Sequence, residues 1–401
     1  MSRSTPALWA LCFGNFVIGT GALIVPGMLP SLAEGLEVPL PVAAQLITAF
    51  AASVCIGAPL LATATSRFDR RTLLAATLAL YVAGHLAAAL VSSFPAMLLV
   101  RVASAAGAAL FTAQAAATAA LLVPPERRGS AIAFVFLGWS VASVAGLPLG
   151  AYVGATLGWR AGFMLVSLGS LLGAAAVWIL VPRGLHVQAA NLAMWRAILR
   201  NRLLLAVLGV TGLFMAATFA LFTYFVPAAR AFVGASPALV SALLAGFGVA
   251  AVAGNVLAAR FMDRVGAANV VALCLATMAA SHLLWPFTPG SVGLLAATML
   301  AWGIGGFAAN SAQQSRLVAM SPSQASVSIA LNTSFVFLGQ ATGAAAASAL
   351  VAHVPGSAGY AAIPWLSVPL LALAVGLSLF ASLRMCAHSG SAHVQGRAFQ
   401  R

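Results

Sequence analysis

The chain is 401 residues long, with 62% hydrophobic and only 6% charged residues. Because soluble domains carry about a quarter charged residues, this composition excludes a water-exposed globular fold. The formal net charge of +14 comes with nineteen arginines and no lysine. In a soluble chain this basic balance would suggest a nucleic-acid partner, but these arginines fall mostly between long apolar segments, so we expect no nucleic-acid binding. The four cysteines have no paired spacing, which argues against a disulfide framework or a thiolate metal site.

Apolar segments follow one another along the whole chain. A helix needs about 20 apolar residues to cross the hydrocarbon layer. The first segment lacks a cleavage site after a short apolar core, so we expect it to be retained rather than removed as a signal peptide. The pattern predicts an all-α membrane protein with twelve spans, at 7–30, 42–65, 72–93, 95–120, 129–156, 160–181, 203–228, 237–259, 267–288, 290–312, 325–351 and 360–383.

The arginines are distributed unequally between the two sets of alternating loops. Sixteen fall on one side: Arg3, Arg67, Arg70, Arg71, Arg127, Arg128, Arg183, Arg196, Arg200, Arg202, Arg260, Arg264, Arg316, Arg384, Arg397 and Arg401. The other side holds only Arg160 and Arg230, and Arg101 lies within a span. Basic residues are retained in the cytoplasm during insertion. We therefore expect both termini to be cytoplasmic and the protein to lie in a bacterial inner membrane, with the lipid bilayer around it.

The longest internal connection divides the chain near its middle, and the two sides repeat at an offset of 197 residues. His85-Leu86 falls on His282-Leu283 and Gly146 falls on Gly343. Two six-helix parallel pseudo-repeats are a transporter architecture in which the substrate path runs between the halves. We predict an N-terminal bundle at 1–181, a cytoplasmic linker at 182–202, a C-terminal bundle at 203–383 and a short disordered tail at 384–401.

Four motifs stand at regular places in this pattern. The loop after the second span reads Ser66-Arg67-Phe68-Asp69-Arg70-Arg71, and its copy after the eighth reads Asp263-Arg264-Val265-Gly266. The fourth span contains Arg101, and Thr112 shares its face by helical period. The fifth span carries spaced glycines and a proline: Gly138, Gly146, Pro148 and Gly150. The tenth and eleventh spans carry amides: Asn310, Gln314 and Asn332.

With these motifs the chain resembles the major facilitator superfamily over nearly its whole length. It is most similar to the sugar-efflux and chloramphenicol-resistance permeases of the twelve-helix drug:proton antiporter branch. The resemblance implies that Arg67, Asp69, Arg70, Arg71, Asp263 and Arg264 form cytoplasmic gate loops that latch the outward-open state. It also implies proton coupling for Arg101 and export for the fifth-span motif. From the residues alone, the loop arginines could instead set topology, and the glycines could serve packing.

The expected substrate cavity is lined by polar and aromatic positions: Asn15, Thr20, Arg101, Thr112, Phe219, Tyr224, Asn310, Gln314 and Asn332. Amides and hydroxyls at these places could equally bond between helices. None of the five acidic residues falls inside an expected span, which favours neutral polyols, neutral amphipaths or anions over cationic drugs. Arg101 and the outer-rim Glu34 are the candidates for proton coupling. His85 and His282 titrate in a suitable range, but their repeat-related positions favour packing.

The resemblance implies a secondary transporter that exports a small neutral or amphipathic solute, sugar-like or chloramphenicol-like, by alternating access with proton antiport. We expect it to be a monomer. A facilitated uniporter or an importer of a small metabolite is the alternative. A membrane-embedded enzyme is more distant, because the chain has no nucleophile–base motif, no ATP-binding lysine loop and few carboxylates. We expect no enzymatic activity, no cofactor and no metal.

Overall fold

The computed structural model describes residues 4–65, 67–186, 200–321 and 325–398, and the described residues are helical with short connections. In the N-terminal half the elements are α1 (Ser4–Gly35), α2 (Leu40–Ala43), α3 (Gln45–Ala64), α4 (Arg70–Leu90), α5 (Phe94–Leu121), η1 (Pro125–Arg127), α6 (Arg128–Val141), the π-turn η2 (Ala142–Gly146), α7 (Leu147–Thr156) and α8 (Trp159–Leu180). In the C-terminal half they are α10 (Arg202–Thr223), α11 (Phe225–Val233), α12 (Pro237–Val265), α13 (Ala267–Leu284), η3 (Trp285–Phe287), α14 (Val292–Met320), α15 (Ala325–His353), α16 (Ser357–Ala362) and α17 (Pro364–Ala398).

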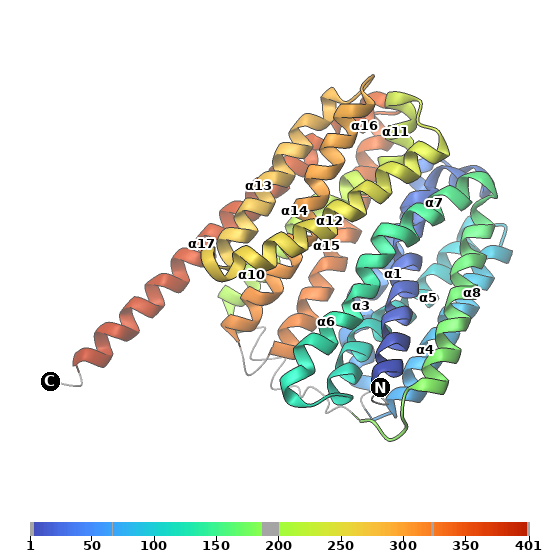
Figure 1. The fold of residues 1–401 in the computed structure, drawn as a ribbon. Helices are drawn as coiled ribbons and strands as arrows, with labels where there is room; N and C mark the ends of the chain where they lie inside the picture. The colour runs from blue at the N-terminus through green and yellow to red at the C-terminus, as the bar shows by residue number, and fades with distance from the viewer. Residues whose placement is uncertain (1–3, 66, 187–199, 322–324, 399–401) are drawn as a thin grey trace.

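Twelve helical spans in the described part of the chain are long and apolar enough to cross a membrane. This confirms the predicted all-α fold. Figure 1 shows the N-terminal half in blue to green beside the C-terminal half in yellow to red. We call the end that carries the start of α1 the basal end, and the end that carries α11 and α16 the apical end.

Several predicted span ends fall short of the observed helices, and the largest differences are at the tenth span and at the tail. The tenth span, expected to end at residue 312, continues as α14 to Met320, so Arg316 is a buried helical residue and not a loop residue. The tail from 384, expected to be disordered, continues α17 to Ala398. In Figure 1 the end of α17 projects away from the bundle. The predicted tenth span is too short because its last turns contain polar residues, which are typical of loops.

Side-chain oxygens start several of these helices. Asn201 accepts hydrogen bonds from the amides of Leu203 and Leu204 at the start of α10, each 3.1 Å long. Ser236 and Ser291 cap α12 and α14 in a similar way. Such residues satisfy amides that have no partner within the first turn of a helix.

The two copies of the arginine-rich loop start the following helix by different means. In the second copy Gly266 has φ +81°, a conformation that favours glycine, and it precedes α13 directly. The repeat-equivalent residue in the first copy is Asp69, which has φ −57° and caps α4 by accepting a hydrogen bond from the Thr72 amide. The side-chain cap explains why the first copy does without the glycine.

The repeat is visible in how helices pack within each half. A side-chain carbon at Gly146 would collide with the hydroxyl of Thr20 on α1, and one at Gly343 would collide with the carbonyl oxygen of Ala216 on α10. Small residues let membrane helices approach closely. The α1–η2 and α10–α15 contacts therefore use the same device at positions related by the repeat.

Candidate functional site

Asn15 and Thr20 lie on the face of α1 that packs against α6 and η2. Asn15 is fully buried and donates a 3.1 Å hydrogen bond to the carbonyl oxygen of Val135 in α6, while its own amide oxygen has no protein partner. Thr20 donates to the carbonyl oxygen of Phe16 in its own helix. The two side chains, predicted as cavity residues, are thus held at the contact between the first and fifth spans.

Amides and a hydroxyl form a chain between three helices of the C-terminal half. Thr211 of α10 donates a 2.8 Å hydrogen bond to the Oδ1 of Asn332, and the Nδ2 of Asn332 donates a 3.0 Å bond to the Oδ1 of Asn310 in α14. Asn332 is fully buried, whereas Asn310 is only partly buried. The network therefore extends from the packed interior of the half to a partly open position.

The tenth span contributes a different glutamine from the one predicted. Gln313 is fully buried and donates to the carbonyl oxygen of Val207 at 2.8 Å, and more weakly to the Thr211 hydroxyl at 3.4 Å. Gln314, the predicted cavity residue, is half-buried and lies one position further round the helix. The Oε1 of Gln313 has no protein partner in the structure, so this side chain retains a free acceptor.

Arg101 lies inside the N-terminal half. Its side chain is 1% exposed, its guanidinium carbon lies 4.2 Å from the centre of the Phe50 ring in α3, and its Nη1 donates a long 3.4 Å bond to the carbonyl oxygen of Gly21 in α1. A charged group at this depth is costly unless it faces protein or water. These contacts hold Arg101 between helices of the N-terminal half rather than toward the lipid.

The remaining predicted cavity residues lie at three separate places. Thr112 is half-buried and accepts a 3.2 Å hydrogen bond from the indole of Trp139. Phe219 packs edge-on against Phe222. Tyr224 interrupts the seventh span between α10 and α11, and its hydroxyl donates a 3.0 Å bond to Ser348 in α15.

The halves contact each other through α3 and α15, and also through η2, α7 and α12. Gly248 of α12 sits directly on the backbone of the π-turn: an added side-chain carbon would lie 2.5 Å from the carbonyl oxygen of Ser143. Ser241, nearer the apical end of α12, donates a 3.0 Å hydrogen bond to the carbonyl oxygen of Pro148. The fifth-span motif residues Gly138, Gly146, Pro148 and Gly150 are all buried. Gly138 and Gly146 bring α1 close, and Pro148 belongs to the contact with α12.

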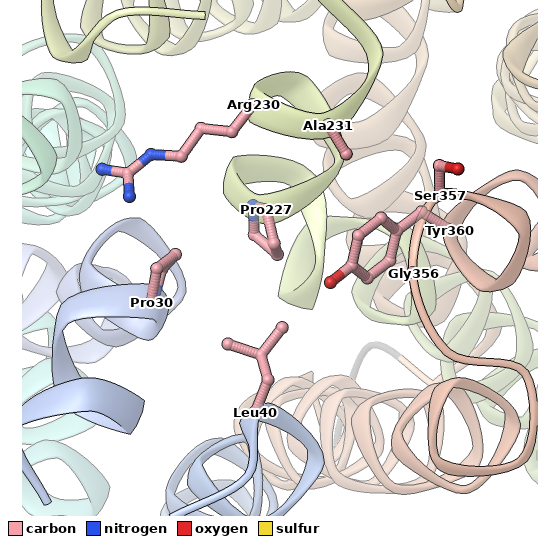
Figure 2. A pocket seen from close by; sticks show the side chains of 8 residues that line it. All are labelled: Pro30, Leu40, Pro227, Arg230, Ala231, Gly356, Ser357 and Tyr360. Atoms are coloured by element: carbon pink, nitrogen blue, oxygen red, sulfur yellow. The ribbon is translucent and has the colours of Figure 1, made fainter. Parts of the chain in front are cut away.

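A pocket of about 520 Å³ lies at the apical end between the halves. Figure 2 shows Pro30 and Leu40 on one side, and Pro227 and Tyr360 on the other. Arg230 also borders this pocket. A second pocket of the same size lies between the apical parts of α3 and α15. None of the nine predicted cavity residues lines either pocket in the described part of the chain.

The predicted gate residue Asp69 joins the loop before α4 to the chain that follows α8. Its carboxylate accepts hydrogen bonds from the amides of Gly184 at 2.7 Å and Leu185 at 3.1 Å, in addition to Thr72. Partial burial alone would raise the pKa of Asp69, but these hydrogen bonds to the charged form outweigh it and lower the pKa below the ordinary 3.8. Asp69 is therefore a fixed anion within the N-terminal half.

The neighbouring arginines also contact residues of their own half. Arg70 is fully buried at the start of α4 and donates from Nη1 to the side-chain oxygen of Gln114 in α5. Arg71 stacks over Trp178 of α8, with 4.5 Å between the guanidinium carbon and the ring centre. Arg67 stacks on the adjacent Phe68.

Three other predicted positions have less defined surroundings. Arg264 is exposed in the last turn of α12, and the side chain of Asp263 lies outside the described residues. Glu34 is exposed in the last turn of α1, at the apical rim. In the linker, residues 187–199 also lie outside the described residues.

Sequence reasoning missed Thr211, Gln313 and Trp139 as members of these polar contacts. All three are polar groups in apolar spans, which is a signal that the sequence does carry. Which groups meet depends on the rotation of each helix about its axis, and the sequence does not give that rotation to within one residue.

Three comparisons with known proteins bear on this site. The model of the Major Facilitator Superfamily matches residues 11–233. The chain is 29% identical over 377 residues to "Inner membrane transport protein YdhP" of Escherichia coli (strain K12), covering 94% of this chain and 96% of the relative. It is 37% identical over 262 residues to "Chloramphenicol resistance protein" of Streptomyces lividans, covering 64% of this chain and 67% of the relative.

A solved structure shows the same fold. A bacterial homologue of the human lysosomal transporter Spinster, in an inward-facing and unoccupied conformation, superimposes with a TM-score of 0.76 at 16% identity. The match covers 95% of this chain and 97% of that structure.

Proposed function

The chain belongs to the Major Facilitator Superfamily and is a multi-pass membrane transporter of a small solute, and we propose that it exports a neutral or amphipathic compound across the bacterial inner membrane. The compound is sugar-like or resembles chloramphenicol. Export is driven by antiport of protons through alternating access of the two halves. The basal face, which carries most of the arginines, is the cytoplasmic face under the positive-inside rule.

We infer the substrate class from the polar groups in the interior of the described part of the chain. Asn15, Asn310 and Asn332 offer amide groups, whereas the acidic residues lie near helix ends or in connections. A cationic drug would find no carboxylate beside these amides in the described part of the chain. A neutral polyol or amphipath can use amide and hydroxyl partners, and the buried side-chain oxygens of Asn15 and Gln313 have no hydrogen-bond partner among the described residues.

The direction of transport rests on the fifth span. Its glycines and Pro148 hold the π-turn against Gly248 of α12, which gives this span a direct part in closing the apical end. The relative from Streptomyces lividans is named for chloramphenicol resistance, which supports export of a compound of that kind.

In this alternating-access mechanism, the two bodies that move are the predicted bundles at 1–181 and 203–383. The apical contacts through Ser241 and Gly248 support an arrangement that is closed toward the periplasm. In this proposal Arg67, Asp69, Arg70 and Arg71 form a rigid cytoplasmic block within the N-terminal half. Arg264 and Asp263 belong to its counterpart, and the block latches against the other half when the basal end closes.

The function is tested with the purified full chain in sealed proteoliposomes loaded with radiolabelled chloramphenicol or, separately, a labelled neutral disaccharide. We expect one of the two probes to be driven against its gradient when a pH gradient is imposed, and to move only downhill without it. Movement that ignores the pH gradient would favour the uniporter. Accumulation in the same direction as the proton would favour the importer.

A further inference from the structure

Four buried residues from three helices meet around Gly21 in the N-terminal half: Tyr81 and His85 of α4, Arg101 of α5, and Gly21 itself on α1. Tyr81 is fully buried, and His85 and Arg101 are each 1% exposed. An added side-chain carbon at Gly21 would lie 2.5 Å from the hydroxyl oxygen of Tyr81 and 2.7 Å from the Nε2 of His85. The absence of a side chain at position 21 therefore allows these polar groups to approach α1.

The hydrogen bonds fix the protonation of the imidazole in this arrangement. The Nδ1 of His85 lies 2.9 Å from the carbonyl oxygen of Tyr81, which can only accept, so Nδ1 carries the hydrogen. The Nε2 faces the backbone of Gly21 and forms no hydrogen bond of good geometry with a described residue. This is the geometry of a neutral histidine with one free basic nitrogen in a dry site.

The backbone carbonyl oxygen of Gly21 accepts a long hydrogen bond of 3.4 Å from the Nη1 of Arg101. Four helices bring groups to the imidazole: α1 brings the backbone of Gly21, α5 brings Arg101, α8 brings the ring of Phe163 at 5.9 Å, and α4 brings Tyr81. Among the described residues there is no carboxylate in this set. A proton on Nε2 would place a second cation beside Arg101 with no anion to balance it.

The repeat supplies an internal comparison. His282, at the position equivalent to His85, is also buried, but its Nδ1 meets the hydroxyl of Ser367 at 2.9 Å. The position equivalent to Arg101 is Thr298, whose hydroxyl bonds within its own helix. The second half thus keeps the histidine but not the cation, so only the first half combines a free imidazole nitrogen with a charge that its protonation would repel.

We propose that His85 is the proton-binding group of this transporter: Nε2 takes a proton from the aqueous phase, and the resulting imidazolium displaces Arg101 from the carbonyl oxygen of Gly21. Protonation of His85 and attachment of Arg101 to α1 then exclude each other. Because Arg101 also lies over Phe50 of α3, its displacement acts on two helices that contact the C-terminal half. This inference rests on the proposed proton antiport and names the group that carries it.

The experiment needs no substrate, so it separates this inference from the proposed function. Spin labels are placed at Gly129 and Asn269, which are exposed basal positions in opposite halves, in the full chain with its native cysteines replaced and reconstituted in nanodiscs. The label-to-label distance distribution is measured between about pH 4 and about pH 8.5, which extends below the range in which a free histidine changes charge because Arg101 opposes protonation of His85. We expect the parent protein to change from one population to another with a single midpoint.

The variants distinguish a proton-binding role from a packing role. His85→Asn and His85→Gln should abolish the pH response while remaining monodisperse. The matched variant His282→Asn, which alters an equally buried histidine, should retain the response, as should Glu34→Gln at the apical rim. Arg101→Gln should move the midpoint to higher pH by about one unit, the scale expected when one close charge is removed.

Four results would overturn the proposal: no pH response in the parent, an unchanged midpoint in both His85 variants, loss of the response in His282→Asn, or loss of the response in Glu34→Gln. If the His85 variants fail to fold, an unchanged midpoint in Arg101→Gln would overturn it equally. A pH response that depends on His85 in a protein that moves neither probe would leave this inference standing while the proposed substrate class fails.

Discussion

Ser241 of α12 donates a hydrogen bond of 3.0 Å to the carbonyl oxygen of Pro148 in α7, and this bond joins the two halves near the apical end. Pro148 lies just beyond the π-turn of the fifth span, and Gly248 of α12 rests on that turn. π-turns inside α-helices are frequent at functional sites. Contact on backbone atoms leaves little room for adjustment, so this contact between the halves depends on the absence of a side chain at position 248.

Gly248→Ala should open the apical end. The added methyl group would lie within 2.7 Å of three backbone atoms of Ser143 and Val144, which cannot rotate away. Gly246→Ala is the matched control, because its methyl group would meet only a side-chain carbon of Leu300 at 3.5 Å. Spin labels at the exposed positions Ser92 and Ala238 report the separation of the halves. We expect a longer-distance population in Gly248→Ala alone, and equal distributions in the two variants would refute the role of this contact.

Asn332→Ala should impair transport more than it impairs stability. Interhelical hydrogen bonds in membranes contribute about 0.6 kcal/mol on average, so the melting temperature should fall only slightly. If Asn332 and Asn310 hold the solute, the loss of the amide should raise the KM for the transported probe about tenfold, which corresponds to about 1.4 kcal/mol. Asn269→Ala removes an exposed amide that donates to the carbonyl oxygen of Val265 at the end of α12, and it should change neither quantity.

Stability and transport that fall together in Asn332→Ala would assign the network to packing. An unchanged KM in a variant of normal stability would remove Asn332 from the substrate path. In that case the partly buried Asn310 and the half-buried Gln314 remain the candidates on α14.

The twelve spans were predictable because the bilayer allows few alternatives to a long apolar helix, and the offset of 197 residues gave the relation between the halves. The partners of polar residues were not predictable in the same way. Choosing Gln313 over Gln314 requires the rotation of α14, and the approach of His85 to Arg101 requires knowing that α1 presents Gly21 to α4 and α5. The predicted boundary at residue 312 failed because Gln313, Gln314 and Arg316 are as polar as a loop.

Arg316 is buried, as Arg70 and Arg101 are, and its replacement should destabilise the protein. Its guanidinium donates to the hydroxyl and carbonyl oxygens of Ser378 at 2.9 Å and 3.1 Å, and to the hydroxyl of Ser382 at 3.0 Å. Hydrogen bonds to charged groups contribute about 1.5–3 kcal/mol each. We expect Arg316→Gln to lower the melting temperature in detergent by several degrees, whereas Arg260→Gln, at an exposed position of α12, should have little effect. Equal melting temperatures for both variants would show that the Arg316 contacts contribute nothing.

Asp69 should make the stability of the N-terminal half depend on pH in the acid range. Because its pKa is lowered in the folded protein, the carboxylate stabilises the fold above the ordinary value of 3.8, and this contribution is lost as the pH falls through the lowered pKa. Asp69→Asn keeps a residue that caps helices well but removes the charge that attracts the amides of Gly184 and Leu185. The melting temperature of the parent should therefore exceed that of the variant near neutral pH, and the two should converge in acid. Because the side chain is only partly buried, solvent screens its charge, and the effect should stay below about 1 kcal/mol. Glu126→Gln removes an exposed carboxylate from η1 and controls for net charge. A constant difference between parent and Asp69→Asn at every pH would mean that the hydrogen-bonded carboxylate is not the source of the stabilisation.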